Sequence, residues 1–199
     1  MAATVPPHAV LVDGHPLPKP VAGHPALEFC NTWAGWEEPE HPGAEWLVDY
    51  DRFVLWAEFT GLVPPPAAAR LRGRTEDAVL TRARALRRAL YRILRRHDDS
   101  EFDVLAAEAD EANRHARLTA TDGTVHFALP DDGNPLLPLR SVALSAVDLL
   151  SGPKRKNVRA CPGDGCGWLF LDPRGRRIWC SMASCGNRAK VRAHASRHK

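Results

Sequence analysis

The chain has 199 residues, of which 44% are hydrophobic and 26% are charged, a composition typical of a soluble globular protein. Its net charge of +3 hides an asymmetry: residues 152–199 carry 12 Lys and Arg against two Asp, whereas the first 151 residues carry 15 against 22 acidic residues. A basic end on an acidic body indicates that the basic end meets a polyanion.

Neither a targeting segment nor a membrane span is expected. The first basic residue is Lys19, and two prolines interrupt the apolar part of the N-terminal stretch, which excludes a signal peptide. No run of about 18 uncharged apolar residues occurs. We therefore expect a cytoplasmic protein with no membrane partner. In that reducing compartment, five cysteines with four of them clustered favour a metal site over disulfides.

Residues 1–152 predict one mainly helical domain of the α+β class. A proline-rich leader with a short strand at AVLV comes first, and HPALEFCNTWAGW follows as a short apolar helix or strand, in which Cys30 is a buried small hydrophobe. DYDRFVLWAEFTGLV has helical spacing and ends at Gly61, and a short helix is expected in VPPPAAARLRGR.

The longest expected helix starts after Thr75, which can cap its N-terminus. Its apolar residues fall in one arc, the pattern of a helix that faces a core. Arg87 lies at the edge of that arc and therefore needs a carboxylate or a ligand as partner. The arginines on the opposite face either bind anions or form a solvated face that the acidic segment SEFDVLAAEADEANRHA partly neutralises: Arg84, Arg88, Arg92 and Arg95.

The rest of this domain is a hairpin and a helix. ARLTATDGTVHFALP predicts two short strands that turn at Asp122 and Gly123. Asn134 can cap a last helix whose first residue is Pro135 and which Gly152 ends. We place the domain boundary there, with PKRKN as a linker into a second module at 153–199.

The second module contains two cysteine pairs of equal spacing. Cys161 and Cys166 form the first pair, and Cys180 and Cys185 form the second, so that each short loop supplies two corners of a tetrahedral four-thiolate zinc site. Between the pairs, WLFLDPRGRRIW predicts a hairpin that is too small to fold without a metal. The alternatives are two disulfides, four unliganded cysteines, or a site that uses the second pair together with His194 and His198.

The segment after Cys185 predicts a helix with basic residues around most of its circumference. Val191 is its only sizeable apolar residue, so the helix has little to bury and is free to lie along phosphates. A solvated basic end that binds nothing specific is the alternative.

The motifs of both parts resemble known families. CPGDGCGWLFLD followed by WCSMASCGNRAKVRAH resembles the CGNR zinc finger, whose four name-giving residues here begin at Cys185. GHPALEFCNTWAG, LWAEFTGLV and LRRAL resemble the ABATE domain that precedes this finger, and Arg87 matches a recurrent arginine of that domain. The resemblance implies a bacterial, stress-induced transcription regulator with one structural zinc ion, a DNA-binding zinc-ribbon or treble-clef-like finger and a ligand-sensing or dimerising N-terminal domain.

We therefore expect DNA as the partner, with a small-molecule effector and a homodimer as further candidates. Asn187 and Arg188, in the first turn of the last helix, are expected to reach base edges, because Asn suits adenine and Arg suits guanine. The remaining expected contacts are to phosphates, from the hairpin and the helix: Arg176, Arg177, Lys190, Arg192 and Arg197.

The expected effector site consists of Asn31, Thr32 and Arg87, lining a polar pocket for an anionic or amide-bearing molecule. Alternatively, Asn31 only caps a chain end and Arg87 only pairs with Glu28. No catalytic motif occurs and a four-thiolate zinc ion has no open coordination position, so we expect no enzyme. An RNA- or protein-binding adaptor, in which the tryptophans of the finger stack on unpaired bases, is the alternative function.

Overall fold

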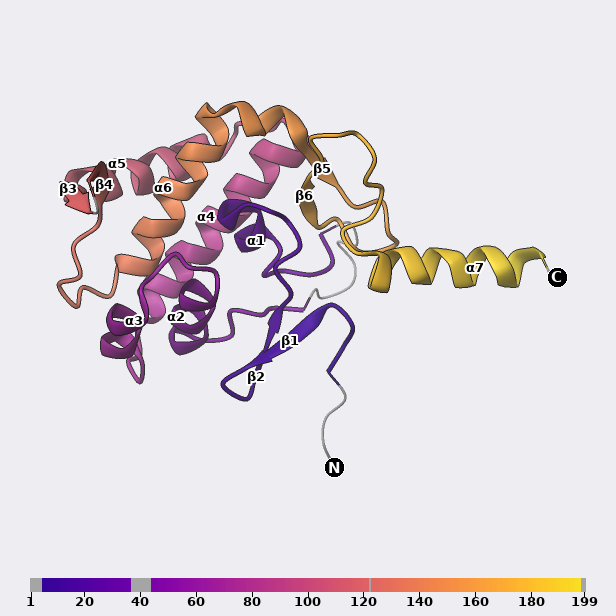
Figure 1. The fold of residues 1–199 in the computed structure, drawn as a ribbon, viewed down its shortest axis with the longest axis horizontal. Coiled ribbons are helices and arrows are strands. Elements are labelled where there is room, and N and C mark those ends of the chain that lie inside the picture. The colour runs from indigo at the N-terminus through magenta and orange to yellow at the C-terminus, as the bar shows by residue number, and fades with distance from the viewer. Residues whose placement is uncertain (1–4, 37–43, 122, 198–199) are drawn as a thin grey trace. The chain divides into compact units, whose positions relative to one another are not determined.

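The fold is described from a computed structural model, which covers residues 5–36, 44–121 and 123–197 (Figure 1). The chain forms two compact units. The first, here called the split unit, joins Met1–Trp46 to Pro153–Lys199, and the second, the helical unit, is Leu47–Gly152. Within the described ranges, no helix has the length and the apolar composition needed to cross a membrane.

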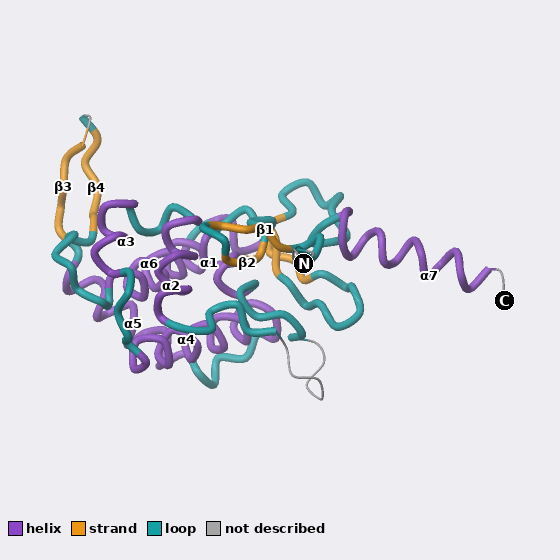
Figure 2. The backbone as a smooth tube through the Cα atoms, turned by 90° about the horizontal axis from the view of Figure 1, so that it is seen from below, coloured by secondary structure: helices purple, strands orange, loops and turns teal. Residues whose placement is uncertain are grey.

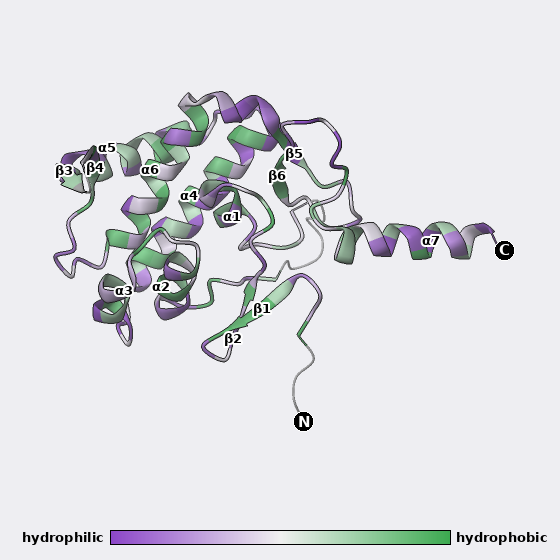
Figure 3. Cartoon of the chain, viewed as in Figure 1, coloured by the Kyte–Doolittle hydropathy of each residue, from purple (hydrophilic) through white to green (hydrophobic). Residues whose placement is uncertain are grey.

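The helical unit packs its longer helices around an apolar core. The core face of α4 is the arc that the sequence predicts, with Leu86, Leu90 and Ile93 among its buried residues. Figure 1 shows how these helices are arranged, and Figure 3 shows green, hydrophobic segments recurring along them. Its elements are α2 (Tyr50–Phe59), α3 (Pro65–Leu71), α4 (Asp77–Arg96), α5 (Phe102–His115), α6 (Leu137–Ser151), β3 (Arg117–Thr121) and β4 (Thr124–Ala128).

The split unit is built from small elements, among them one 3-10 helix and one π-helix. Its core lies around the cysteines and the aromatic residues Trp168 and Phe170. Its elements are β1 (Ala9–Val12), β2 (His15–Pro18), α1 (Pro25–Cys30), the 3-10 helix η1 (Pro153–Asn157), β5 (Val158–Ala160), β6 (Leu169–Leu171), the π-helix η2 (Met182–Gly186) and α7 (Asn187–Arg197). The expected mainly helical α+β class, with a small C-terminal module of strand pair, cysteine cluster and final helix, is confirmed.

The arginine face of α4 is partly neutralised within the helical unit. Arg88 and Arg92 both pair with Glu101, just before α5, and the Arg92 Nη1 to Glu101 Oε1 distance is 2.6 Å. Arg84 donates to the Leu47 carbonyl oxygen at 2.7 Å. These contacts support the interpretation of a solvated face that is partly neutralised by the segment before α5.

Two helix starts differ from the sequence expectation. α4 begins at Asp77, with Glu76 rather than Thr75 at its N-cap. α6 begins at Leu137 rather than at Pro135, because Pro138 has no N–H to donate and is tolerated only in a first helical turn. Asn134 still satisfies a backbone group there, since its side chain accepts the N–H of Leu136 at 2.9 Å.

The hairpin expected around residues 172–175 is wrong in its pairing. β6 pairs with β5, in the register Val158 to Leu171, and not with residues 176–179. The carboxylate of Asp172 accepts the N–H groups of Arg176 and Arg177, each at 3.1 Å. These bonds fold the chain into a tight turn and use the N–H groups that a second strand would need.

One hairpin was not expected from the sequence. β1 pairs with β2 through a turn at Asp13 and Gly14, which have φ of 49° and 76°. Such positive φ values are those of a type I′ turn, and Asp-Gly between two short apolar runs is the usual signal for it. The prolines in HPLP obscured the second strand, although an edge strand tolerates proline.

Candidate metal centre and nucleic-acid surface

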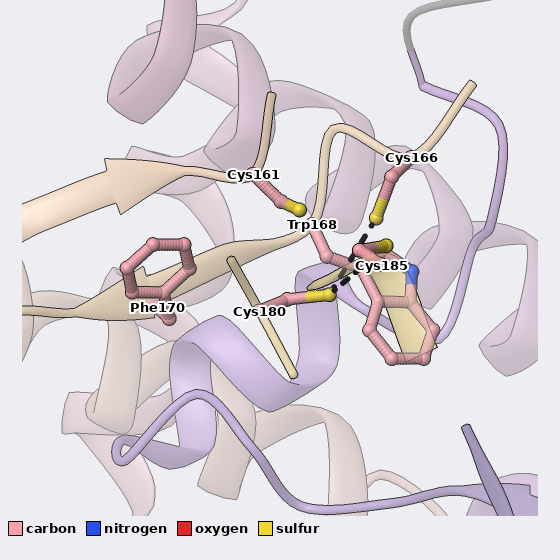
Figure 4. Close-up of a cluster of buried hydrophobic side chains, with 6 residues drawn as sticks. All are labelled: Cys161, Cys166, Trp168, Phe170, Cys180 and Cys185. Carbon is pink, nitrogen blue, oxygen red and sulfur yellow. Dashed lines mark hydrogen bonds between the residues drawn. The ribbon is translucent and has the colours of Figure 1, made fainter. Parts of the chain in front are cut away.

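The four cysteines predicted as metal ligands lie together and are buried. Their sulfur atoms are all within 4.8 Å of one another, and Figure 4 shows the side chains of Cys161, Cys166, Cys180 and Cys185 converging on one point. They come from the loop after β5, the turn before β6, the bend before η2, and η2 itself. The fifth cysteine, Cys30, is buried in α1, as expected for a small hydrophobe.

The distances between the sulfur atoms fit a tetrahedral zinc ion. Zinc binds thiolates at about 2.3 Å, and a tetrahedron of that size places its sulfur atoms about 3.8 Å apart. The Cys166 to Cys180 sulfur distance is 3.7 Å, and the Cys180 to Cys185 distance is 3.6 Å. Neither is a disulfide, whose sulfurs would be about 2 Å apart. The cluster therefore fits one structural zinc ion held by four thiolates.

Glycines make room for this cluster. A Cβ on Gly163 would lie 2.9 Å from the Cys185 sulfur and 3.3 Å from the Cys161 sulfur. The Gly163 carbonyl accepts the Cys166 N–H at 2.8 Å, which closes the first loop. A Cβ on Gly186 would meet the sulfur of Met182 at 2.7 Å. Gly163 therefore lets the first loop approach the sulfur atoms more closely than a residue with a Cβ would, whereas the end of the flexible Met182 side chain could shift away from a Cβ at Gly186.

Arg188 lies against the metal centre. Its Nη2 donates to the Cys185 sulfur at 3.0 Å. The neighbouring thiols of Cys161, Cys166 and Cys180, followed by the Arg188 guanidinium, lower the pKa of Cys185 and favour its thiolate. A four-thiolate zinc centre carries a net negative charge, so Arg188 supplies a compensating positive charge from the first turn of α7.

The N-terminal segment of the split unit is bonded to the finger strand. The Asn31 side-chain amide donates to the Leu169 carbonyl at 2.9 Å and accepts the Leu169 N–H at 2.8 Å. The Trp168 indole N–H donates to the Trp33 carbonyl at 3.0 Å, and the Leu171 N–H to the Ala22 carbonyl at 2.8 Å. One edge of β6 pairs with β5, and the other edge is therefore bonded to residues about 140 positions earlier in the sequence.

Arg177 also ties these two segments together. Its Nη2 donates to the Val21 carbonyl at 2.7 Å and to the Cys180 carbonyl, and its Nε donates to the Trp179 carbonyl at 3.1 Å. The guanidinium lies 4.3 Å from the centre of the Phe170 ring. Arg177 therefore uses its donors inside the unit, whereas the neighbouring Arg176 is exposed.

Glu28 organises the turn before α1. Its carboxylate accepts the N–H groups of Val21, Ala22 and Gly23, the shortest at 2.6 Å. Burial raises the pKa of Glu28 to about 7 despite these bonds. The turn therefore holds the Val21 carbonyl where Arg177 donates to it and the Ala22 carbonyl where the Leu171 N–H donates to it.

α7 has no buried face. Every residue of this helix except the half-buried Ala189 is exposed, and Figure 3 shows hydrophilic residues recurring along its length. The Asp164 carboxylate pairs with it, at 2.7 Å from Arg192. Figures 1 and 2 show that the N-terminal end of α7 is attached to the finger and that the rest of the helix extends away from it. The remaining exposed cations on it are Arg188, Lys190 and Arg197.

The three residues expected to bind an effector are all buried. Asn31 and Thr32 are fully buried, and the Thr32 hydroxyl donates to the Phe29 carbonyl at 2.6 Å. Arg87 is buried in α4, as its place in the helix predicts. Because Arg87 belongs to the helical unit and Asn31 to the split unit, their proximity stays a prediction.

Several contributors to the site were not found from the sequence. His8 packs edge-on against Trp168 and lines a cavity of about 110 Å³ beside the sulfur atoms, with Ala34 and Ser184. Val21 and Trp36 pack against the cysteine cluster. Nothing in the spacing of these residues indicates a contact with cysteines so far away in the sequence.

The helical unit also contains an ion pair that the sequence did not predict. The Arg140 guanidinium pairs with the Glu111 carboxylate, with 2.8 Å between Nη2 and Oε1.

The comparisons with known proteins agree with this geometry. The model of the ABATE family, described as "Putative stress-induced transcription regulator", matches residues 23–153. The model of the CGNR zinc finger matches residues 157–198. No curated protein gives a significant match. The chain therefore belongs to the ABATE family and ends in a CGNR zinc finger.

Proposed function

We propose that the chain is a bacterial, cytoplasmic transcription regulator that binds DNA through its finger. Residues 1–152 form the sensing or dimerising part in this proposal, and residues 153–199 form the DNA-binding part. The observation that carries it is α7, a helix with cations on several faces, no buried face and a metal-anchored N-terminus. A fully exposed basic helix gains nothing from folding against its own chain and suits a polyanionic groove.

The phosphate contacts come from exposed cations of the finger. Lys190, Arg192 and Arg197 lie along α7, and Arg176 lies in the turn after β6. Arg177 is left out of this set because its donors already bind carbonyl groups within the split unit. Each phosphate contact would release a counterion, so affinity falls as salt rises.

Base recognition is assigned to the first turn of α7. Asn187 is exposed at the start of the helix and can make a bidentate contact with adenine. Arg188 can reach guanine only with the nitrogens that its bond to Cys185 leaves available. We therefore expect Asn187 to discriminate bases more strongly than Arg188.

Stacking on unpaired RNA bases is less well supported. Trp168 is 3% exposed, and Trp179 is half-buried against the cysteine cluster. These rings fill the small core of the finger, which leaves few free aromatic faces for single-stranded bases. The zinc ion serves the fold in this proposal, since four thiolates leave no coordination position for a substrate.

An effector would act through the bond between Asn31 and β6. An amide-bearing molecule that pairs with Asn31 competes for the two hydrogen bonds that hold Leu169. In this way Asn31 and Thr32, with Arg87 as the proposed third ligand, would couple sensing to the position of the finger.

The proposed function is tested by sequencing the genomic DNA that the zinc-loaded chain retains. We expect a recurrent motif, and we expect the variant with Lys190→Ala and Arg197→Ala to retain little DNA. A matched variant with Arg95→Ala and Arg96→Ala removes two exposed arginines from the helical unit and should behave as wild type. Recovery of RNA, or of DNA without any dependence on α7, would contradict the proposal.

A further inference from the structure

The hairpin of β3 and β4 exposes an apolar face. Leu118, Val125 and Phe127 are 65%, 63% and 70% exposed, the values of side chains that touch little of their own chain. Figure 2 shows the hairpin extending from the helices of its unit. Exposed large apolar side chains that occur singly are ordinary, but three on one small element need an explanation.

The register of the hairpin places these side chains on one face. Leu118 is paired with Phe127, and Ala120 with Val125, so all four point to the same side. The opposite face carries the pair Thr119 and His126. The hairpin is therefore amphipathic, as a strand pair that packs against something is.

Packing within the hairpin does not account for this face. A two-stranded hairpin is only marginally stable in water, and a third strand or a covering layer is usually required. In the described residues, β3 and β4 form a sheet of their own with no further strand. Both strands consequently present free edges as well as an open apolar face.

The charges of the hairpin favour a second copy of the chain as the covering layer. Arg117 carries the one permanent charge of its described residues, and it lies on the face opposite Leu118. A two-fold contact places the same surface on both sides, so a face without charge avoids the self-repulsion that a face of one charge would cause. Nucleic acid is disfavoured because the apolar face offers no cation to its phosphates.

The shape of the face is also suited to its own copy. It has one row of two large side chains, Leu118 and Phe127, and one row with the small Ala120 beside Val125. When two such faces pack in opposite directions, the large row of one copy lies over the smaller row of the other, which fills space on both sides.

We infer that the β3–β4 hairpin is the homodimer surface of this protein, where two copies pack their apolar faces around a two-fold axis. The inference rests on the dimer that the proposed function includes, and it supplies the surface for it. A symmetric dimer would place two fingers on two half-sites, as many DNA-binding regulators do.

The test is sedimentation velocity of the full-length, zinc-loaded chain, from about 1 to 100 μM. We expect a dimer whose dissociation constant rises at least about 100-fold in Leu118→Glu and in Phe127→Glu, since each dimer then buries two unpaired carboxylates. Thr119→Glu and His126→Glu, the matched pair on the opposite face, should change the dissociation constant less than about threefold. Far-UV circular dichroism and zinc content check that all four variants fold.

Three results would overturn the inference. The first is a wild-type chain that is monomeric over the whole concentration range. The second is a dimer whose dissociation constant changes equally whether the substitution lies on the apolar face or on the opposite face. The third is a monomer whose helical unit melts at a lower temperature in Phe127→Glu, because the face would then be covered by its own chain. The sedimentation experiment contains no DNA, so it tests the dimer surface independently of DNA binding. A chain that is monomeric in sedimentation but binds DNA in a separate assay would refute the dimer surface and leave the proposed DNA binding intact.

Discussion

In the helical unit, α2, α4, α5 and α6 bury leucine, alanine and aromatic side chains against one another, whereas the split unit assembles part of its core from four cysteines, Trp168 and Phe170. The first unit has enough apolar area to fold by burial. The second closes its C-terminal segment on a metal, and a few buried hydrogen bonds join that segment to one about 140 residues earlier in the sequence. Metal ligation and exact polar pairing can therefore replace apolar area in a small unit.

Removing the metal should separate the two units most clearly. Cys180→Ser, or a strong chelator, is expected to release one zinc ion and to cost the split unit about 10 kcal/mol or more. Hydrogen exchange should then increase in residues 158–197 and also in residues 5–36, because β6 anchors both segments. The helical unit should keep its circular dichroism signal. A metal-free chain whose finger remains protected would contradict the zinc assignment.

The pairing of Asn31 with Leu169 is the next test of the comparison. Asn31→Ala leaves a buried N–H and a buried carbonyl of Leu169 without partners, which should destabilise the split unit by about 2 to 6 kcal/mol. Asn134→Ala is the control, because its amide supports α6 and its loss should cost about 1 kcal/mol in the helical unit only. Chemical denaturation, with hydrogen exchange to monitor each unit, measures the loss of stability in both variants. Equal effects on the two units would show that they are not separate.

Acid should affect the two units over different pH ranges. Hydrogen bonds from Arg114 and Arg140 lower the pKa of Glu111 to about 2. The ionised carboxylate therefore stabilises the helical unit fully above its unfolded pKa near 4.5, and this contribution is lost as the pH falls towards 2. Urea unfolding at a series of pH values should show this loss, and Glu111→Gln should flatten it. A variant with an unchanged pH profile would exclude Glu111 as its source.

The split unit should respond to acid at a higher pH. Thiolates must be deprotonated to hold zinc, so acidification releases the metal. A zinc-sensitive dye should report release while the circular dichroism of the helical unit is unchanged. Simultaneous loss of both signals would mean that the helical unit also depends on the metal.

A smaller effect is expected from Asp164, an acidic partner of α7. Asp164→Asn removes the carboxylate that pairs with Arg192 at 2.7 Å and should raise DNA affinity by up to about fivefold, the range of an exposed ion pair. In an Arg192→Ala background the same change should have less effect. Fluorescence anisotropy at constant salt measures the difference, and a loss of affinity in Asp164→Asn would refute this role.

The sequence predicts the helical unit well because its signals are local. The apolar arc of α4 and the Gly152 stop of α6 are confirmed, since amphipathic spacing and end residues act within a few turns. The four cysteines were found for the same reason, because each pair lies within one short loop.

The rest of the split unit depends on contacts that no local pattern encodes. Asn31 ends an apolar helix and could equally cap it, line a pocket or bond to another segment, and only the fold pairs it with Leu169. Arg176 and Arg177 are neighbours in the sequence, yet it is Arg177 that donates to the Val21 carbonyl. The pairing of β6 with β5 was missed because Asp172 takes the N–H groups of the nearer candidate strand.

The most direct test of the account is the salt dependence of DNA binding. The slope of log affinity against log salt should fall by about 0.9 for each phosphate contact removed, in Lys190→Ala and in Arg197→Ala, and by about 1.8 in the double variant. Arg96→Ala, an exposed arginine of the helical unit, should leave the slope unchanged. If both α7 variants kept the wild-type affinity and slope, the helix would be a solvated basic end and the proposed function would be wrong.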